Sequence, residues 1–305
     1  MPIHSATDME GEHRHRRSIG GIMNLRLFFI SILLLCFASA CHNSSGLEGS
    51  VVDGKGQPMA KIKLIAKEIQ GVGDKQFETM TDDRGNCRFE NLTPSTSYVI
   101  LPRSDQWKTE TKLFATSGRR FRTATLEGAF VIRFTLKDGV ISDSRTGLEW
   151  LPDSEYRYSW TGASKYVKGL KSYSVPCEWR LPTDRELMGI YYFRALDQQI
   201  RIDNLFRLRS PFVWTSETVD YRQSPEDYFR VLSALSMEST PFGGTIEVTV
   251  ANPAAYLRQL DASGEALQIL AKYFDFGSGA DKWTKDRDPS RDMRILTVRA
   301  PKEGT

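Results

Sequence analysis

The chain has 305 residues and an almost balanced charge, with 41 Lys and Arg against 38 Asp and Glu and a formal net charge of +3. This balance excludes the broad basic field with which proteins bind nucleic acid non-specifically, so we expect no nucleic-acid partner. Three of the four His lie within the first 15 residues, ahead of an apolar signal-like segment, and the remaining His42 and four Cys leave few groups for imidazole-based catalysis or for His- and Cys-rich metal sites. We therefore expect no catalytic residues, no metal and no cofactor.

An apolar run from Leu27 to Phe37 lies near the N-terminus and is followed by Ala38-Ser39-Ala40-Cys41. It is short for a membrane span but has the length of the apolar core of a secretory signal. Small residues followed by Cys resemble the lipobox of bacterial lipoproteins, in which the Cys is lipidated and becomes the new N-terminus. We predict a lipoprotein signal at residues 23–40 and lipidation at Cys41. The alternative is a plain secretory signal cleaved just before an ordinary cysteine.

The residues before and after the predicted signal indicate where the mature protein begins and where it is sorted. Residues 1–22 precede a complete signal, so we interpret them as a non-native upstream extension. Residues 41–46 read as a short polar tether. His42, rather than Asp, follows the predicted lipidated Cys, which in Gram-negative bacteria favours sorting to the outer membrane. We therefore expect an outer-membrane lipoprotein of the bacterial cell envelope that contacts the membrane through its lipid.

Residues 47–137 have the pattern of an all-β domain. Residues 60–67 alternate charged and apolar side chains, as a half-buried strand does, and follow a turn cluster at 54–58. Asp82-Asp83-Arg84-Gly85 separates two strand-like runs, which predicts a hairpin-type turn with Gly85 free to adopt positive φ. Further strands are expected around 112–116 and 129–136.

This succession of elements resembles the carboxypeptidase-regulatory-like family of seven-stranded, transthyretin-like β-sandwiches. The matching elements are Gly49–Asp53, Gly56–Ala60, Thr81–Asn86, Phe89, Leu92 and Tyr98. The resemblance implies that these positions form turns and core, that none of them is catalytic, and that the domain is a spacer on an exported protein.

A region rich in aromatic residues begins at Asp138. Within it, residues 163–170 place apolar side chains at i, i+3, i+4 and i+7, which predicts an amphipathic helix. Thr183 is a good N-cap, and Glu186 follows three residues later as in a capping box. A final strand is expected over residues 293–300.

Six ordered elements of this region resemble the bacterial family typified by the C-terminal domain of the Lcl collagen-like adhesin. They are Asp138–Asp143, Thr146–Trp150, Ser159–Ala163, Trp179–Leu187, Val213–Ser216 and Ile295–Arg299. The resemblance covers residues 138–301 and implies a C-type-lectin-like α+β fold, with two helices around a small twisted sheet. Its characterised members are implicated in adhesion and glycosaminoglycan binding. The expected fold class is therefore an all-β sandwich followed by an α+β C-type-lectin-like domain.

Two features depart from that family. Thr297 stands where the family carries a Cys, so Cys177 has no evident partner in its own domain. A Cys87–Cys177 disulfide is permitted by an oxidising compartment, and two isolated buried thiols are the alternative. Residues 220–272 read as an insertion, within which 253–260 and 264–274 look like amphipathic, helix-like pieces.

Basic clusters supply the candidate ligand-binding residues. Arg194, Arg201, Arg207 and Arg209 are weakly compensated by acidic neighbours and suit a sulfated or acidic glycan. A second cluster, between Lys282 and Arg294, is interleaved with Asp and reads as a salt-bridged surface. Four tryptophans lie in framework motifs and are expected in the core: Trp150, Trp160, Trp179 and Trp214. Trp107 and Trp283 lie outside those motifs and are freer to be exposed. We therefore assign ligand binding to Arg201, Arg207, Arg209 and Trp283.

Two further functional interpretations, an anion site at Arg180 and a catalytic pair of Glu149 and Glu186, are less favoured than purely structural roles for these residues. Arg180 suits an anion site, but a buried arginine that pairs with a carboxylate and fixes the helix start is the better explanation. Glu149 and Glu186 would have to lie close together to act as a glycosidase pair, and nothing in their spacing favours this.

The predicted function is that of a non-catalytic, adhesin-like recognition module that binds a glycan or protein in the envelope or on a neighbouring surface. One alternative is a structural subunit of an envelope or secretion assembly. Another is an enzyme, because Arg180–Thr183 with Glu186 also resembles the signature of formylglycine-generating-type enzymes. Those enzymes require a reactive Cys pair, or three His in iron-binding relatives. The predicted mature chain has neither, because only His42 remains of the four His and only Cys87 and Cys177 remain as thiols once Cys41 is lipidated.

Overall fold

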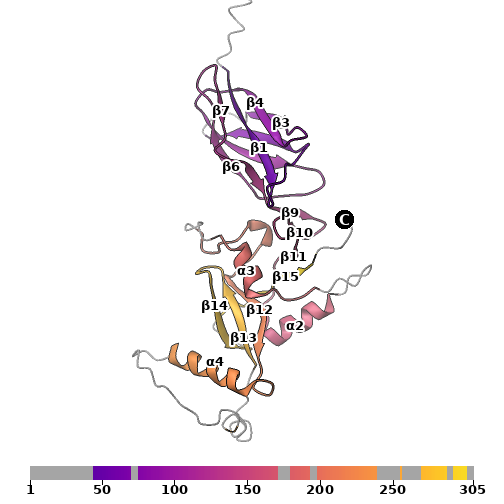
Figure 1. The fold of residues 1–305 in the computed structure, drawn as a ribbon, viewed down its shortest axis with the longest axis vertical. Coiled ribbons are helices and arrows are strands. Elements are labelled where there is room, and N and C mark those ends of the chain that lie inside the picture. Colours follow the sequence, from indigo (N-terminus) through magenta and orange to yellow (C-terminus); the bar gives the residue numbers. More distant parts are fainter. Residues whose placement is uncertain are drawn as a thin grey trace, which may run out of the picture.

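A computed structural model describes residues 44–69, 75–170, 179–192, 198–238, 255, 269–286 and 291–300 (Figure 1). Most of the regular structure in these ranges is β-strand. The strands are β1 (Ser45–Asp53), β2 (Lys63–Glu68), β3 (Gln76–Met80), β4 (Asn86–Leu92), β5 (Ser97–Arg103), β6 (Leu113–Thr116), β7 (Thr123–Thr125), β8 (Phe130–Ile132), β9 (Phe134–Lys137), β10 (Val140–Asp143), β11 (Glu149–Leu151), β12 (Phe212–Val219), β13 (Leu270–Asp275), β14 (Ala280–Lys285) and β15 (Thr297–Arg299). The helices are α2 (Trp160–Gly169), α3 (Asp184–Ile190), α4 (Pro225–Glu238) and the 3-10 turn η1 (Asn204–Phe206).

Two four-stranded sheets share the first core. One has the order β4-β1-β7, with β8 also paired to β1, and the other has the order β3-β2-β5-β6. Strand β1 changes partner along its length, since Gly46 pairs in parallel with Thr123 of β7 and Val51 with Phe130 of β8. Fully buried side chains from both sheets, including Tyr98, fill the space between them.

The turn predicted at Asp82–Gly85 is confirmed. Gly85 donates its N–H to the Asp82 carbonyl over 3.0 Å and has a φ of +77°. A Cβ at Gly85 would lie 2.6 Å from the Val51 carbonyl oxygen, so the position requires glycine on steric grounds as well.

A short junction joins these sheets to the rest of the chain. A single residue, Arg133, separates β8 from β9, which continues into the sheet β15-β11-β10-β9. Lys108 and Leu136 exchange backbone hydrogen bonds of 2.9 and 2.7 Å across the junction. The Gly54 N–H donates to the Ser144 hydroxyl over 2.8 Å. The two parts are therefore connected by hydrogen bonds from several segments as well as by the chain itself.

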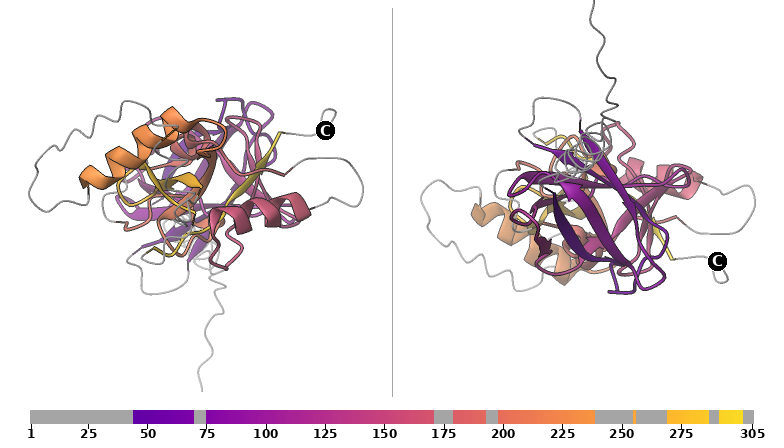
Figure 2. Two further views of the ribbon diagram at one scale, coloured as in Figure 1. Left: turned by 90° about the horizontal axis from the view of Figure 1, so that it is seen from below. Right: turned by 90° about the horizontal axis from the view of Figure 1, so that it is seen from above.

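The C-terminal part contains a third sheet of order β12-β13-β14. Its main core brings together the fully buried Trp150, Leu187, Phe206, Phe274 and Val298, which come from β11, α3, η1, β13 and β15. In both Figure 1 and Figure 2, α2 and α4 lie on opposite sides of this part. Figure 1 also places α4 at the far end of the molecule from β7.

Several predicted elements are confirmed. The amphipathic helix predicted over 163–170 is α2, and Ala163 and Val167 are buried. The final strand is present as β15, although it is shorter than predicted. The strand expected over 129–136 is two strands, β8 and β9, interrupted at Arg133.

The helix-like interpretation of residues 264–274 is wrong where the structure describes them. Residues 270–275 form β13, the central strand of the third sheet, with Leu270, Ala271, Tyr273 and Phe274 all buried. Apolar side chains of β13 lie on both faces, interrupted only by Lys272, so the strict alternation of a half-buried strand is missing and sequence periodicity cannot separate this strand from a buried helix. The predicted insertion therefore overlaps a framework strand at its end. Of the piece at 253–260, only Ala255 lies within the described residues.

Cys87 is the one thiol within the described residues. Cys87 is buried and free, and burial raises the pKa of its thiol. Cys41 and Cys177 lie outside the described residues, as do the signal and the upstream extension. Among the helices described here, none is long and apolar enough to cross a membrane.

Candidate functional site

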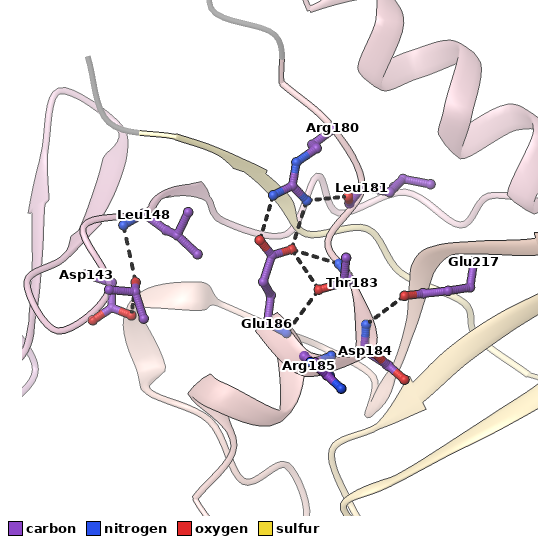
Figure 3. A network of polar contacts seen from close by, with 10 residues as sticks. Asp143, Leu148, Arg180, Leu181, Thr183, Asp184, Arg185, Glu186 and Glu217 are labelled. Carbon is purple, nitrogen blue, oxygen red and sulfur yellow. Dashed lines mark hydrogen bonds and ion pairs between the residues drawn. The ribbon is translucent and has the colours of Figure 1, made fainter. Parts of the chain in front are cut away.

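The N-terminus of α3 is organised by the predicted capping box (Figure 3). The Thr183 hydroxyl accepts from Glu186 N–H over 3.2 Å, and the Glu186 carboxylate accepts from Thr183 N–H over 2.8 Å. Arg180 donates two hydrogen bonds, of 2.6 and 2.8 Å, to the same carboxylate. Burial opposes the charge on Glu186, but the hydrogen bonds from Arg180 and Thr183 outweigh it and lower the pKa of that carboxyl. The predicted pairing of Arg180 with the helix-start carboxylate is confirmed, but its predicted burial is wrong, since its side chain is 46% exposed.

Glu149, the other carboxylate weighed as a catalytic acid, pairs with a different arginine. Arg299 Nε donates to Glu149 Oε2 over 2.5 Å, and the Arg299 guanidinium lies 4.3 Å from the centre of the Trp179 ring. Glu149 and Glu186 therefore belong to two separate ion pairs of the framework, and this arrangement does not support a glycosidase mechanism.

A lysine links α3 to the third sheet beside Trp283. Lys272 Nζ lies 2.8 Å from Asp184 and 2.6 Å from Asp281, and its contact with Asp184 lowers the pKa of that carboxyl. The same ammonium lies 5.9 Å from the Trp283 ring, which is half-buried against α4. Trp283, a predicted ligand contact, thus packs within the framework.

The three predicted arginines that lie in the described residues have different surroundings. Arg201 is half-buried and donates to the Tyr191 hydroxyl over 2.8 Å. Arg207 is exposed, with a left-handed φ of +52° directly after η1. Arg209 is also exposed and forms an ion pair of 3.0 Å with Glu155. Arg207 and Arg209 therefore lie on one exposed segment, apart from the contacts of Arg201.

The partner of Arg209 lies in a loop that sequence reasoning did not single out. Residues 152–159 connect β11 to α2, and we call them the Tyr156 loop. Tyr156 is 69% exposed, and the Arg157 side chain is 72% exposed. Glu155 has a φ of +67°, a strained conformation for a residue with a side chain. The loop therefore presents an aromatic ring between charged side chains on a distorted backbone.

Three tyrosines extend from this loop to α2. The Tyr156 and Tyr158 ring centres are 6.5 Å apart and nearly perpendicular, and those of Tyr158 and Tyr166 are 5.3 Å apart. Tyr166 belongs to the predicted helix, whereas Tyr156 and Tyr158 were missed. The alternation of tyrosine and charged residues just before a helix cap is the sequence signal that would have marked them.

Buried groups fix the base of the Tyr156 loop. The Trp214 indole N–H donates to the Tyr158 carbonyl over 2.8 Å, and Asp153 N–H donates to the Phe206 carbonyl over 2.9 Å. The Arg294 side chain, only 9% exposed, lies 2.6 Å from Asp292 and 3.7 Å from Asp153. Burial raises the pKa of Asp153 despite the attraction of Arg294.

Ion pairs then connect this base to the surface, where Arg157 pairs with Asp292 over 2.8 Å. The exposed side chains of Tyr156 and Arg157 can therefore contact a ligand while the backbone of the Tyr156 loop stays in place. Such a surface can stack on a sugar ring and donate hydrogen bonds to sulfate or carboxylate groups. Among the described residues, no group of three or more His, Cys, Asp or Glu is placed to hold a metal ion.

Comparison with known proteins identifies the C-terminal region. The sequence model of the family described as the Lcl C-terminal domain matches residues 139–299. A comparison with curated protein sequences gives no match.

Two solved structures show weak similarity to the chain. The minor pilin GBS52 of Streptococcus agalactiae has 16% identity and a TM-score of 0.22, over 30% of this chain and 43% of its own. A 9R-lipoxygenase from Cyanothece PCC8801 has 9% identity and a TM-score of 0.23, over 92% of this chain and 49% of its own. The chain thus spans less than half of either protein, and neither similarity bears on its fold or function.

Proposed function

The chain belongs to the Lcl C-terminal domain family, and on this basis we propose that it is a membrane-anchored lipoprotein with a non-catalytic recognition module. In this proposal Cys41 carries the lipid, and residues 41–46 are a tether. Residues 47–137 are a carboxypeptidase-regulatory-like β-sandwich that acts as a spacer. Residues 138–301 are the recognition module, with a C-type-lectin-like fold. The protein resides at the outer membrane of a bacterial envelope.

The ligand we propose is a sulfated or acidic glycan, in keeping with an adhesin-like role. The observation that carries this proposal is the exposed Tyr156 ring flanked by Arg157 and, through Glu155, by Arg209. Arg207 adds a further exposed charge on the segment of Arg209. Tyrosine and arginine are the residues that most often dominate binding energy at recognition surfaces. We leave Arg201 and Trp283 out of this surface because both are engaged within the framework.

The rigidity of the loop base supports the same proposal. A surface that is already ordered before binding loses less conformational entropy when a ligand binds. The buried contacts of Trp214 and Asp153 supply that order, while the tip remains accessible. The module can therefore bind a flexible, charged polymer without an ordering step of its own.

A glycan array with the lipid-free protein tests this proposal. We expect salt-sensitive binding to sulfated glycans, weakened roughly tenfold or more by Tyr156→Ala because a central aromatic contact is lost. Charge reversal at Arg207 and Arg209 is expected to remove most of the salt-sensitive part. Phe114→Ala is the matched control for the ring, since Phe114 is also 69% exposed, and the double variant Arg103→Glu and Arg185→Glu is the control for charge.

Two results would contradict the glycan proposal. Absence of any glycan signal, together with one stoichiometric protein partner recovered from envelope extract, would favour the structural subunit of an envelope assembly. Binding that is equally weakened by Phe114→Ala would mean that the Tyr156 loop is not the contact surface.

Lipidation has its own test. In cells producing the chain, we expect a radioactive fatty acid to be incorporated and the protein to fractionate with membranes. Both properties should be lost in Cys41→Ser, because serine lacks the thiol that carries the lipid. Incorporation that persists in this variant would overturn the assignment of Cys41. Cys87→Ser, at a buried free thiol, is the matched control.

A further inference from the structure

The turn between β6 and β7 exposes an aromatic residue among arginines. Arg119, Arg120, Phe121 and Arg122 are all exposed, and Phe121 retains 65% of its accessible surface. We call these four residues the Arg-Phe turn. Within the described residues none of its three arginines forms an ion pair, whereas the nearby Arg88 pairs with Glu48 and Glu90. The turn therefore carries three uncompensated positive charges around an exposed ring.

The backbone of the turn holds the phenylalanine outward. The Arg122 N–H donates to the Arg119 carbonyl over 2.8 Å, which closes a turn with Phe121 at its third position. Phe121 has a φ of +60° there, a conformation that such turns normally give to glycine or asparagine. Its ring contacts the Arg120 guanidinium, which lies 5.0 Å from the ring centre. A large apolar residue in a strained and exposed position suggests a role outside the core.

The Arg-Phe turn lies beside the start of β1, a few residues after Cys41. Phe121 N–H donates to the Ser44 carbonyl over 2.9 Å, and Gly46 N–H donates to the Arg122 carbonyl over 3.1 Å. Ser44 follows Cys41 by three residues, which span at most about 11 Å even when fully extended. A lipid on Cys41 would therefore bring a membrane surface close to the Arg-Phe turn.

We propose that the Arg-Phe turn binds the anionic surface of the bilayer, with its arginines on headgroup phosphates and the Phe121 ring at the interface. Its place beside the membrane rests on the proposed lipidation of Cys41. Arginine suits phosphate because its planar fork can donate two parallel hydrogen bonds. An aromatic ring adds apolar contact at the boundary between headgroups and acyl chains. The basic patch would add electrostatic attraction for anionic headgroups to the anchoring that the lipid on Cys41 provides.

Vesicle binding by the chain that begins at His42 tests the turn without any lipid on the protein. The probes are phosphatidylethanolamine vesicles with and without phosphatidylglycerol. We expect binding only to the anionic vesicles, and a loss of roughly a hundredfold when Arg119, Arg120 and Arg122 are all changed to Glu. The triple variant Arg84→Glu, Arg103→Glu and Arg185→Glu, which alters the net charge equally at exposed sites, should bind as the unaltered chain does.

The aromatic contribution is tested by Phe121→Asn. Asparagine tolerates positive φ, so this variant should fold at least as stably as the unaltered chain. Its binding should fall by roughly tenfold because the apolar contact is lost. Phe114→Ala, at an equally exposed ring in β6, should leave binding unchanged.

Two outcomes would overturn the inference. One is equal binding of the Arg119, Arg120 and Arg122 variant and the unaltered chain. The other is capture of the arginines by a soluble sulfated polymer with no preference for anionic vesicles, which would make the turn a glycan contact. Either outcome leaves the lipidation of Cys41 open to its own labelling test. The vesicle test uses a chain without Cys41, so its result does not depend on lipid labelling. Failure of the membrane-binding inference and failure of the lipidation proposal can therefore be distinguished.

Discussion

Replacing Arg133 with Ala is expected to destabilise the folded chain by about 3–5 kcal/mol, the cost of leaving a buried charge without its partner. Arg133 donates two hydrogen bonds of 2.8 Å to Asp143, and the Asp143 side chain is completely buried. Asp143 also accepts from the Thr146 hydroxyl and from the Arg145 N–H. None of these remaining donors replaces the lost positive charge, so the carboxylate would remain ionised and uncompensated.

The position of Arg133 makes this loss consequential for the junction. It separates β8 from β9, and Ser144, the neighbour of Asp143, accepts the Gly54 N–H. Urea denaturation at neutral pH measures the effect. Arg88→Ala is the control, since Arg88 pairs only at the surface and its loss should cost at most about 1 kcal/mol. An Arg133→Ala variant no less stable than Arg88→Ala would contradict the prediction.

Acid should reduce the difference between Arg133→Ala and the unaltered chain. Burial raises the pKa of Asp143, but hydrogen bonds from Arg133 and Thr146 outweigh it, so the folded-state pKa lies below the ordinary value of 3.8. A carboxyl with a lowered pKa adds stability that is complete above its unfolded-state value and is lost as the pH falls through the folded-state value. Without Arg133, burial should instead raise this pKa, and protonation would relieve the buried charge. The urea midpoints of the two proteins should therefore converge below about pH 4.

Replacing Trp214 with Ala is expected to cost about 3–5 kcal/mol, as for other large aromatic residues in a packed core. Trp214 is fully buried in β12, where it packs with Ala163 and Val167 of α2 and with Tyr273 of β13. Its indole N–H also donates to the Tyr158 carbonyl over 2.8 Å. The substitution would thus leave a large cavity and free the base of the Tyr156 loop.

Trp214→Phe separates these two effects. Phenylalanine keeps most of the apolar volume but lacks the indole donor, so the Tyr158 carbonyl loses its partner at a cost of about 1–3 kcal/mol. Faster amide hydrogen exchange in residues 152–159 should accompany this loss. Trp283→Ala, at a half-buried ring against α4, is the matched control and should leave exchange in the loop unchanged. Exchange that is the same in Trp214→Phe and the unaltered chain would show that the indole does not fix the loop.

Much of the local structure could be predicted from the sequence. The capping box of Thr183 and Glu186, the turn at Gly85 and the helix that became α2 all depend on residues three or four positions apart in the chain. Their interactions form within a single turn of the chain, so spacing alone reveals them. The pairing of Arg180 with Glu186 spans six residues, but the helix start that fixes Glu186 is itself marked by the local capping box, so this contact could also be predicted.

The candidate surface could be predicted only in part. The basic character of Arg207 and Arg209 is visible in the sequence. The position of Tyr156 beside them is not, because it depends on the ion pair between Glu155 and Arg209. Trp283 illustrates the opposite case, since it lies outside the framework motifs and is nevertheless half-buried against α4. Strand β13 reads as helix for a related reason, because burial on both faces removes the alternation that identifies a strand.

By itself the sequence determined the signal-like N-terminus, the turns, the helix caps and the order of family motifs, since each depends on residues close together in the chain. Only the tertiary structure decided which charges pair and which rings remain exposed. Asp143 is buried against Arg133, Arg209 is drawn to Glu155, and Phe121 is fixed beside Ser44 by backbone hydrogen bonds. These arrangements depend on which strands lie side by side, and sheet topology joins residues that are distant in the chain and share no periodic pattern.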